Sequence, residues 1–301
     1  MAQSTATSAF RWIDRKAIPM ALCACVTFAF LATGCSKAQT DAITMVNHGV
    51  RALNRGDVET ANGYFRRAAR LDPENAAAHY QQGLIAVAHK SDGQAAVGHF
   101  ERALSLDDQH VEVLYQLGRL HTELGEHEKG VPLLSRALQS DPNHAGAWHH
   151  KGLGLLAAGD KQGADLAWRE SIAIDPARAR SFITLGSMYE SVHADEAARA
   201  VYVEGLAHNR GDPDLLNSLG VLELRFREIE SSIEHLNQAL SRDASRTDTL
   251  FNLSFAFAEA GRRRDAVRHL NAFLNRADPI GEKDSMRVAR ALKDSLLAEG
   301  L

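Results

Sequence analysis

Seven uncharged polar side chains recur along this chain at intervals of 34 or 35 residues. Each can donate or accept hydrogen bonds without a fixed full charge, so a row of them could pair with the main chain of an extended polypeptide. A merely solvated face would usually include lysine and glutamate, and neither occurs at these positions, so we favour binding over simple exposure. The seven residues are Asn47, Gln81, Gln116, His150, Thr184, Ser218 and Asn252.

Other reactive residues give little support for metal binding or catalysis. His149 and His150 are adjacent, and neighbouring residues of a helix do not face one another. No third ligand follows them at helical spacing. No serine, cysteine or carboxylate pair recurs with the spacing of a nucleophile or an acid-base pair. We therefore expect neither enzyme activity nor a metal or small-molecule cofactor.

The unit that must position the polar row runs from residue 145 to residue 178, and close variants of it precede and follow. Trp168 can fill the space between two antiparallel helices where Gly152 lacks bulk. Gly159 supplies a turn, and Pro176 ends the second helix. Glycine recurs at the eighth position of six units, as Gly49, Gly83, Gly118, Gly152, Gly186 and Gly220, with Ser254 in the seventh.

Thirty-four residues with tryptophan fourth, glycine eighth, alanine twentieth and proline thirty-second resemble the tetratricopeptide repeat. The resemblance implies an all-α, right-handed superhelix of about seven helix-turn-helix units with a C-terminal capping helix. Each unit would depend on its neighbours to bury its apolar face. The predicted units are 42–75, 76–110, 111–144, 145–178, 179–212, 213–246 and 247–280, and the cap is 281–301.

The resemblance also implies that positions two, five, six, nine and thirteen of each unit face a concave wall. The polar row, at position six, would then line this wall, and positions five and nine would supply side-chain pockets. We predict peptide contacts from Tyr80, Tyr115, Arg119, His149, Phe251 and Phe255, and the same positions hold Leu84, Leu153, Ile183 and Asn217. Position five contains no lysine, which disfavours the family's clamp for an acidic carboxyl terminus.

Residues 1–34 have the features of an export segment, because Arg11, Arg15 and Lys16 precede an almost uncharged apolar run. The run ends in LATGC, which resembles the lipobox of bacterial lipoproteins and implies that Cys35 carries the lipid, palmitate included. Ala32 stands where that family usually has leucine. Cleavage by the ordinary signal peptidase at Ala32-x-Gly34 and retention as an uncleaved anchor stay open as alternatives.

Residues 35–41 would form the lipidated N-terminus and a short linker. Ser36, rather than aspartate, follows the cysteine, which by the same resemblance implies the periplasmic face of the outer membrane. A soluble periplasmic protein and an inner-membrane anchor are the alternatives. The formal net charge of -4 argues against nucleic acid as a partner.

These features predict a membrane-anchored scaffold or adaptor that binds proteins or extended peptides in bacterial envelope assembly. Lipoproteins of this build are similar to those that assist pili and secretins, so pilus or secretin biogenesis is the pathway we favour. The alternative is an accessory adaptor that activates an envelope enzyme, in polysaccharide export or peptidoglycan remodelling.

Overall fold

The computed structural model describes residues 36–90 and 92–298 of the chain. Within those ranges every regular element is an α-helix, which confirms the predicted all-α fold. None of these helices combines the length and the hydropathy needed to cross a bilayer. The predicted export segment and Cys35 lie outside the described residues.

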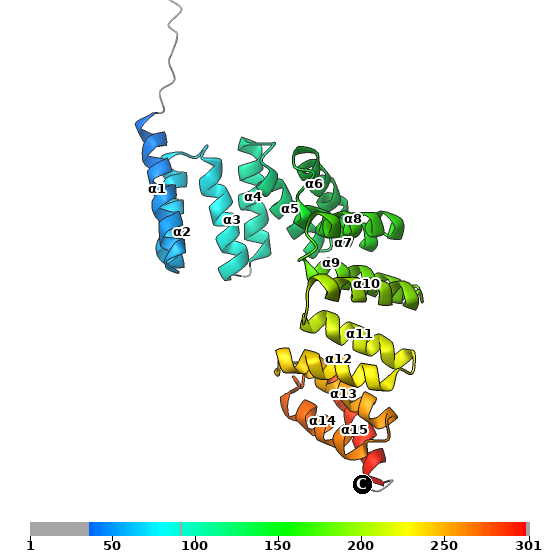
Figure 1. Ribbon diagram of the computed structural model, residues 1–301. Coiled ribbons are helices and arrows are strands. Elements are labelled where there is room, and N and C mark those ends of the chain that lie inside the picture. The colour runs from blue at the N-terminus through cyan, green and yellow to red at the C-terminus, as the bar shows by residue number, and fades with distance from the viewer. Residues whose placement is uncertain (1–35, 91, 299–301) are drawn as a thin grey trace, which may run out of the picture. The chain divides into compact units, whose positions relative to one another are not determined.

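The helices follow one another as antiparallel pairs, and each pair packs on the next (Figure 1). The first helices of the pairs are α1 (Lys37–Asn54), α3 (Ala76–Lys90), α5 (Val111–Glu123), α7 (Ala145–Ala157), α9 (Ala179–Ser191), α11 (Pro213–Arg225) and α13 (Thr247–Glu259). The second helices are α2 (Val58–Leu71), α4 (Gly93–Leu106), α6 (His127–Ser140), α8 (Lys161–Ile174), α10 (Asp195–His208), α12 (Ile229–Arg242) and α14 (Arg263–Arg276). A last helix, α15 (Lys283–Ala298), packs against α13 and α14.

Helix α1 begins before the expected first unit, because residues 37–41 are helical rather than a linker. This stretch contains lysine, alanine and glutamine, which favour helix, and no glycine or proline. Ala42, the next residue, is fully buried, so the helix is already anchored to the core at that point. In the described chain only Ser36 precedes the helix.

In six of the seven pairs the turn places one residue in the left-handed backbone region, and the turn of the remaining pair, α3–α4, includes residue 91, which lies outside the described residues. Gly125 and Gly159 adopt φ values of 80° and 87° there, which glycine tolerates because it has no Cβ. In the next two pairs the equivalent residues are His193 and Arg227, with φ values of 58° and 62°. A non-glycine residue in this region costs roughly 1–2 kcal/mol, so these two turns carry strain that the glycine turns lack.

In six of the seven pairs a glycine on the first helix receives a large side chain from the second helix of the same pair, and in the seventh Ser254 takes the place of the glycine. A Cβ built on Gly152 would lie 2.5 Å from Nε1 of Trp168, and one on Gly186 would overlap the ring of Tyr202. Trp168 and Tyr202 are fully buried. The corresponding second-helix residues in the other pairs are also fully buried: Phe65, Phe100, Leu134, Leu236 and Leu270.

Long side chains also tie consecutive pairs together by holding the carbonyls of the turns between them. Asn209 Nδ2 donates to the carbonyl oxygen of Pro176 at 2.9 Å, and Arg136 Nη2 donates to that of Asp108 at 2.6 Å. A helix end leaves carbonyls without partners inside the helix, so such bonds satisfy groups that would otherwise depend on water. The pairs are therefore joined by polar contacts as well as by the core.

Helix α15 closes the C-terminal end of the core. Met286, Ala289 and Leu296 are buried in the same apolar cluster as Phe257 and Phe273. The opposite side of α15 is exposed and combines charged residues such as Arg287 and Arg290 with the apolar Val288 and Leu297. The helix thus covers an apolar face that the last pair cannot bury alone.

Candidate functional site

The predicted polar row lies on the first helices of the pairs, and most of its members are half-buried. Half-burial keeps the amide or hydroxyl at the surface while neighbouring side chains restrict its motion. His150 is an exception, with an exposed fraction of 8%. Asn47 is exposed, and Gln81, Gln116, Thr184, Ser218 and Asn252 are half-buried.

A hollow of about 450 Å³ lies over the start of α9, α11 and α13. It brings together Ser218 from the polar row with Ile183 and Asn217 from position five. Side chains from three successive pairs can therefore contact one ligand at this place, which we call the α9–α13 hollow. Its lining also includes Ala179, Arg180, Asp212, Asp214, Arg246 and Asp248.

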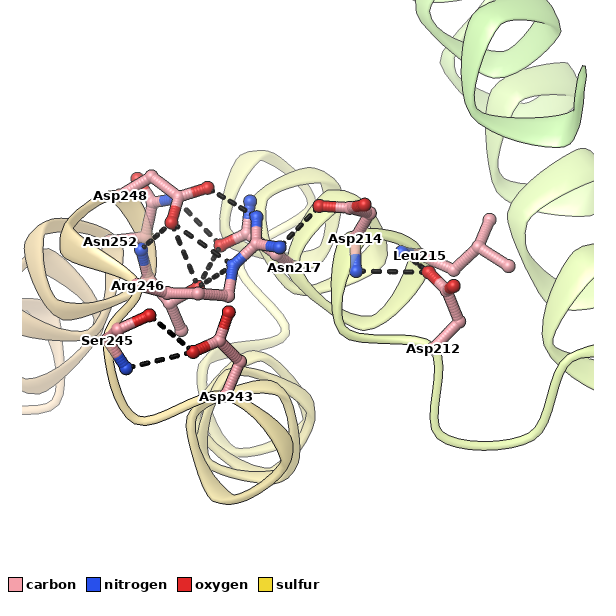
Figure 2. A network of polar contacts seen from close by, with 10 residues as sticks. Asp212, Asp214, Leu215, Asn217, Asp243, Ser245, Arg246, Asp248 and Asn252 are labelled. Carbon is pink, nitrogen blue, oxygen red and sulfur yellow. Dashed lines mark hydrogen bonds and ion pairs between the residues drawn. The ribbon is translucent and has the colours of Figure 1, made fainter. Parts of the chain in front are cut away.

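The side-chain oxygen of Asn217 accepts two hydrogen bonds from α13 (Figure 2). Thr249 Oγ1 donates to it at 3.0 Å and Asn252 Nδ2 at 3.1 Å. Two bonds saturate a carbonyl oxygen, so they fix the orientation of the Asn217 amide. Within the described chain the amino group of Asn217 makes no hydrogen bond, and neither does the side-chain oxygen of Asn252. The two residues thus offer one donor and one acceptor, which is what a peptide unit requires.

Arg246, directly before α13, orders two of the three acidic residues that line the hollow (Figure 2). Its guanidinium donates to Asp214 on α11 and, at 2.5 Å, to Oδ2 of Asp248 on α13. The Arg246 side chain is only 15% exposed, whereas those of Asp214 and Asp248 are 56% and 50% exposed. The cation therefore lies beneath two carboxylates that face the solvent.

Aromatic side chains occupy the equivalent positions on α3 and α5. The ring of Tyr80 lies 5.6 Å from that of His110, and the ring of Tyr115 lies 4.3 Å from that of His144. Each histidine precedes the following first helix and caps it by accepting a backbone N–H. Burial, with Glu112 as a second cause, raises the pKa of Tyr80 to about 12, so its hydroxyl remains a donor at neutral pH.

A chain of hydrogen bonds runs along α5 and fixes two predicted contact residues. Gln116 Nε2 donates to Glu112 at 2.7 Å, and Arg119 Nε donates to the Gln116 oxygen at 3.1 Å. Arg119 Nη1 also forms an ion pair with Glu123 at 2.8 Å. Gln116 and Arg119 are therefore held in defined orientations, as pre-organised binding groups must be.

His149 and His150 lie in the interior rather than on the predicted binding surface. His149 is 1% exposed, and its Nδ1 lies 3.0 Å from Oγ of Ser181 on α9. Nε2 of His149 and Nδ1 of His150 are buried without hydrogen-bond partners. Burial lowers the pKa of His149 to about 4 and that of His150 to about 3, with arginine charges as further causes. The structure therefore does not support a peptide contact for His149.

The two phenylalanines predicted as contact residues pack chiefly on each other and on the core. The rings of Phe251 and Phe255 are 4.9 Å apart, and Phe251 lies 5.1 Å from the buried ring of Phe273. Both are half-buried, so each retains part of its surface for a ligand. Among the described residues, no group of three or more His, Cys, Asp or Glu side chains is placed to hold a metal ion.

The sequence prediction missed the residue that directly precedes the first helix in five of the seven pairs, from α5 to α13. These residues recur every 34 positions and combine histidine, arginine and aspartate, so they bring charge beside the uncharged polar row. Their constant spacing was the signal that could have revealed them. The set is His110, His144, Arg178, Asp212 and Arg246.

Comparison with known proteins supports the repeat assignment. Two family models described as tetratricopeptide repeat match residues 46–111 and 86–153. Human protein O-mannosyl-transferase TMTC3 is 22% identical over 151 residues, which cover 48% of this chain and 16% of that protein. A TPR repeat-containing protein of Pseudomonas aeruginosa is 33% identical over 57 residues, which cover 19% of this chain and 54% of that protein. Neither match spans two thirds of the relative.

Solved structures share the fold at low sequence identity. A tetratricopeptide repeat protein from Parabacteroides merdae superposes with a TM-score of 0.63 and 14% identity, covering 86% of this chain and 99% of that one. Pseudomonas aeruginosa pilF superposes with a TM-score of 0.59 and 19% identity, covering 70% of this chain and 96% of that one. These similarities establish a superhelical repeat architecture.

Proposed function

We propose that this chain, in which residues 46–111 and 86–153 match tetratricopeptide repeat models, is a scaffold that binds an extended segment of a partner protein through its first helices. The α9–α13 hollow carries the proposal, since the first helices of three successive pairs offer side chains to one ligand there. Asn217 and Asn252 present a donor and an acceptor beside each other. Bonds to a peptide main chain would give affinity without requiring one particular sequence. We propose no catalytic role.

The scaffold acts, in this proposal, at the bacterial outer membrane on its periplasmic face. Support comes from the basic residues, the apolar run and the LATGC stretch of the sequence. Each lipid methylene buried in a membrane contributes about 0.8 kcal/mol, and stable attachment takes more than one chain. A diacylglycerol on Cys35 would supply two chains. Assembly of pili or secretins is the pathway favoured by the similarity in sequence architecture.

Metabolic labelling tests the anchor. Cells that express the full chain are grown with a clickable palmitate analogue, and we expect label on the unchanged protein and on Cys23→Ser. Cys35→Ala should remain unlabelled and leave the membrane fraction. Label that persists on Cys35→Ala would contradict lipidation at this residue. An unlabelled full chain in the soluble periplasm, or in the inner membrane, would support one of the two alternative locations.

Site-specific photocrosslinking tests partner binding. A photoreactive phenylalanine at Ser218, which lines the hollow, should capture a partner protein in intact cells. The same group at Asn237, exposed on α12 and outside the lining, is the matched control. Recovery of pilin or secretin supports assembly, and recovery of a hydrolase or synthase supports the adaptor alternative. Equal capture at both positions would contradict binding at the hollow.

A further inference from the structure

The α9–α13 hollow presents opposite charges on two edges. On α11 and α13, Asp214 and Asp248 expose about half of their side-chain surface, while Arg246 behind them is mostly covered. A ligand approaching this edge therefore meets carboxylate oxygens before it meets the guanidinium. Bonds from Arg246 hold both carboxylates in place. Oδ1 of Asp248 also accepts from Arg246 Nε and from the backbone N–H of Thr249, so lone pairs for a ligand remain on Oδ2 of Asp248 and on the Asp214 carboxylate.

The opposite edge carries an exposed cation. Arg180, in the first turn of α9, lines the same hollow. In the described part of the chain its guanidinium has neither an ion pair nor a hydrogen-bond partner, unlike that of Arg246. An exposed, unpaired guanidinium can bind a carboxylate in a bidentate manner, through two parallel N–H···O hydrogen bonds. This edge therefore favours an acidic group on a ligand.

Local helix chemistry does not explain why arginine stands at position 246. The residue before a helix is usually one that accepts a backbone N–H, and substitution of such a cap costs about 1 kcal/mol. Arg246 makes no capping bond to α13, whereas Asp212 caps α11 with two. A position that departs from a local stability rule often serves a site. Here the arginine orders the acidic edge.

We propose that the hollow selects a peptide segment in which a basic and an acidic side chain project to the same side. The basic group pairs with Asp214 and Asp248, the acidic group pairs with Arg180, and Asn217 bonds to the main chain between them. In an extended segment, side chains two residues apart share a side and lie roughly 7 Å apart. The selected segment thus has its two charges two or four residues apart. This inference rests on the proposed function, since it assigns selectivity to the same surface.

Selection from a random dodecapeptide display library tests the selectivity. The full chain, purified in mild detergent, is the bait, and deep sequencing measures enrichment. We expect segments with lysine or arginine two or four residues from aspartate or glutamate to be enriched at least fivefold over the starting library. The order of the basic and the acidic residue along the chain should be the same in all enriched peptides, because the two charged edges have fixed positions.

Variants test the contribution of Arg180 and that of the two aspartates separately. Arg180→Gln should remove the preference for the acidic residue only, and Asp214→Asn with Asp248→Asn should remove the preference for the basic residue only. The matched controls are Arg290→Gln and Asp294→Asn, both exposed on α15. Thermal unfolding followed by circular dichroism shows whether each variant is folded.

The outcomes distinguish this inference from the proposed function. The proposed selectivity would be wrong if the enriched peptides had no pair of opposite charges. It would also be wrong if every hollow variant still enriched peptides with the same pair. If such peptides were nevertheless lost with Asn217→Ala, main-chain binding at the hollow would stand. A full chain that enriches no peptide would contradict both.

Discussion

The side-chain amide of Asn252 donates to the side-chain oxygen of Asn217 across 3.1 Å, and this bond joins the first helices of the last two repeats. The two residues come from positions five and six of successive repeats, so the contact crosses the boundary between them. It also determines which polar atoms of these amides face a ligand. A single bond thus serves both the stacking of repeats and the chemistry of the surface.

Substitution of Asn217 should affect stability as well as binding. Asn217→Ala removes the acceptor of two hydrogen bonds, and one donor, Thr249, is fully buried. The Thr249 hydroxyl would still accept from Arg246 Nε at 3.1 Å and lies 3.4 Å from Oδ1 of Asp248, so the loss is that of a hydrogen bond rather than of a buried unpaired group. We therefore expect a loss of about 0.5–1.5 kcal/mol in the free energy of urea unfolding. Asn237→Ala, on the exposed side of α12, should change it by less than about 0.5 kcal/mol. Equal effects of the two substitutions would contradict the structural role of Asn217.

Adding one methyl group to a packed glycine should destabilise the fold. The Cβ of Gly152→Ala would lie 2.5 Å from Nε1 of Trp168, which donates to the His149 carbonyl. Overpacking of this kind costs roughly 1–3 kcal/mol, measured by denaturant unfolding. Gly63→Ala is the matched control, since its Cβ meets nothing within 4 Å. The control should be neutral or stabilising by up to about 1 kcal/mol, because alanine favours helix.

The buried histidines should make the fold sensitive to acid. The pKa values of about 4 for His149 and 3 for His150 lie below the ordinary 6.5, so between these values the unfolded chain binds more protons than the folded one. Their stabilising effect is therefore complete above pH 7 and is lost as the pH falls from 6.5 towards 4. Each histidine contributes a slope of up to about 1.4 kcal/mol per pH unit.

The test is how steeply the free energy of unfolding changes with pH, rather than its value at one pH. Urea unfolding at pH 7, 6 and 5 should show a weaker pH dependence in His149→Asn and His150→Asn than in the unchanged chain. Asn237→Ala, on the exposed side of α12, replaces a residue that does not titrate and is the control, so it should keep the original slope. An unchanged slope in both buried-site variants would contradict their neutral, buried state.

Relief of backbone strain should stabilise one of the irregular turns. His193 adopts a φ of 58° in the place where the preceding repeat has Gly159. His193→Gly should raise the free energy of unfolding by about 0.5–1 kcal/mol, because the steric cost exceeds the added entropy of the unfolded glycine. The reverse change, Gly159→His, should lower stability by a similar amount. Thermal unfolding of both variants measures the pair of effects.

The fold could be predicted from the sequence because the main contact within a pair, a small residue against a large one, can be recognised from the residue types and their spacing. A glycine and a large residue stand 16 residues apart in five units, as Gly152 and Trp168 do, and 17 apart in the second unit, which fits the close pairing of two helices. The start of α1 could not be predicted in this way, because residues 37–41 precede the first glycine of the pattern and depend only on local helix preference.

The surface was less predictable than the fold. Position within a repeat indicates which side of a helix a residue occupies, yet burial also depends on the size of its neighbours. His149 is buried because the small Ser181 of the next repeat leaves room for its ring. The ion pairs of Arg246 join residues of two repeats, so they follow from three-dimensional contact rather than from the repeat pattern.

The contact between Gly152 and Trp168 lies wholly within one repeat. A gene duplication that copies residues 145–178 therefore copies both halves of the contact together. The length of the array can change by whole modules while every module keeps a filled interior, and only the surfaces between modules need to adjust.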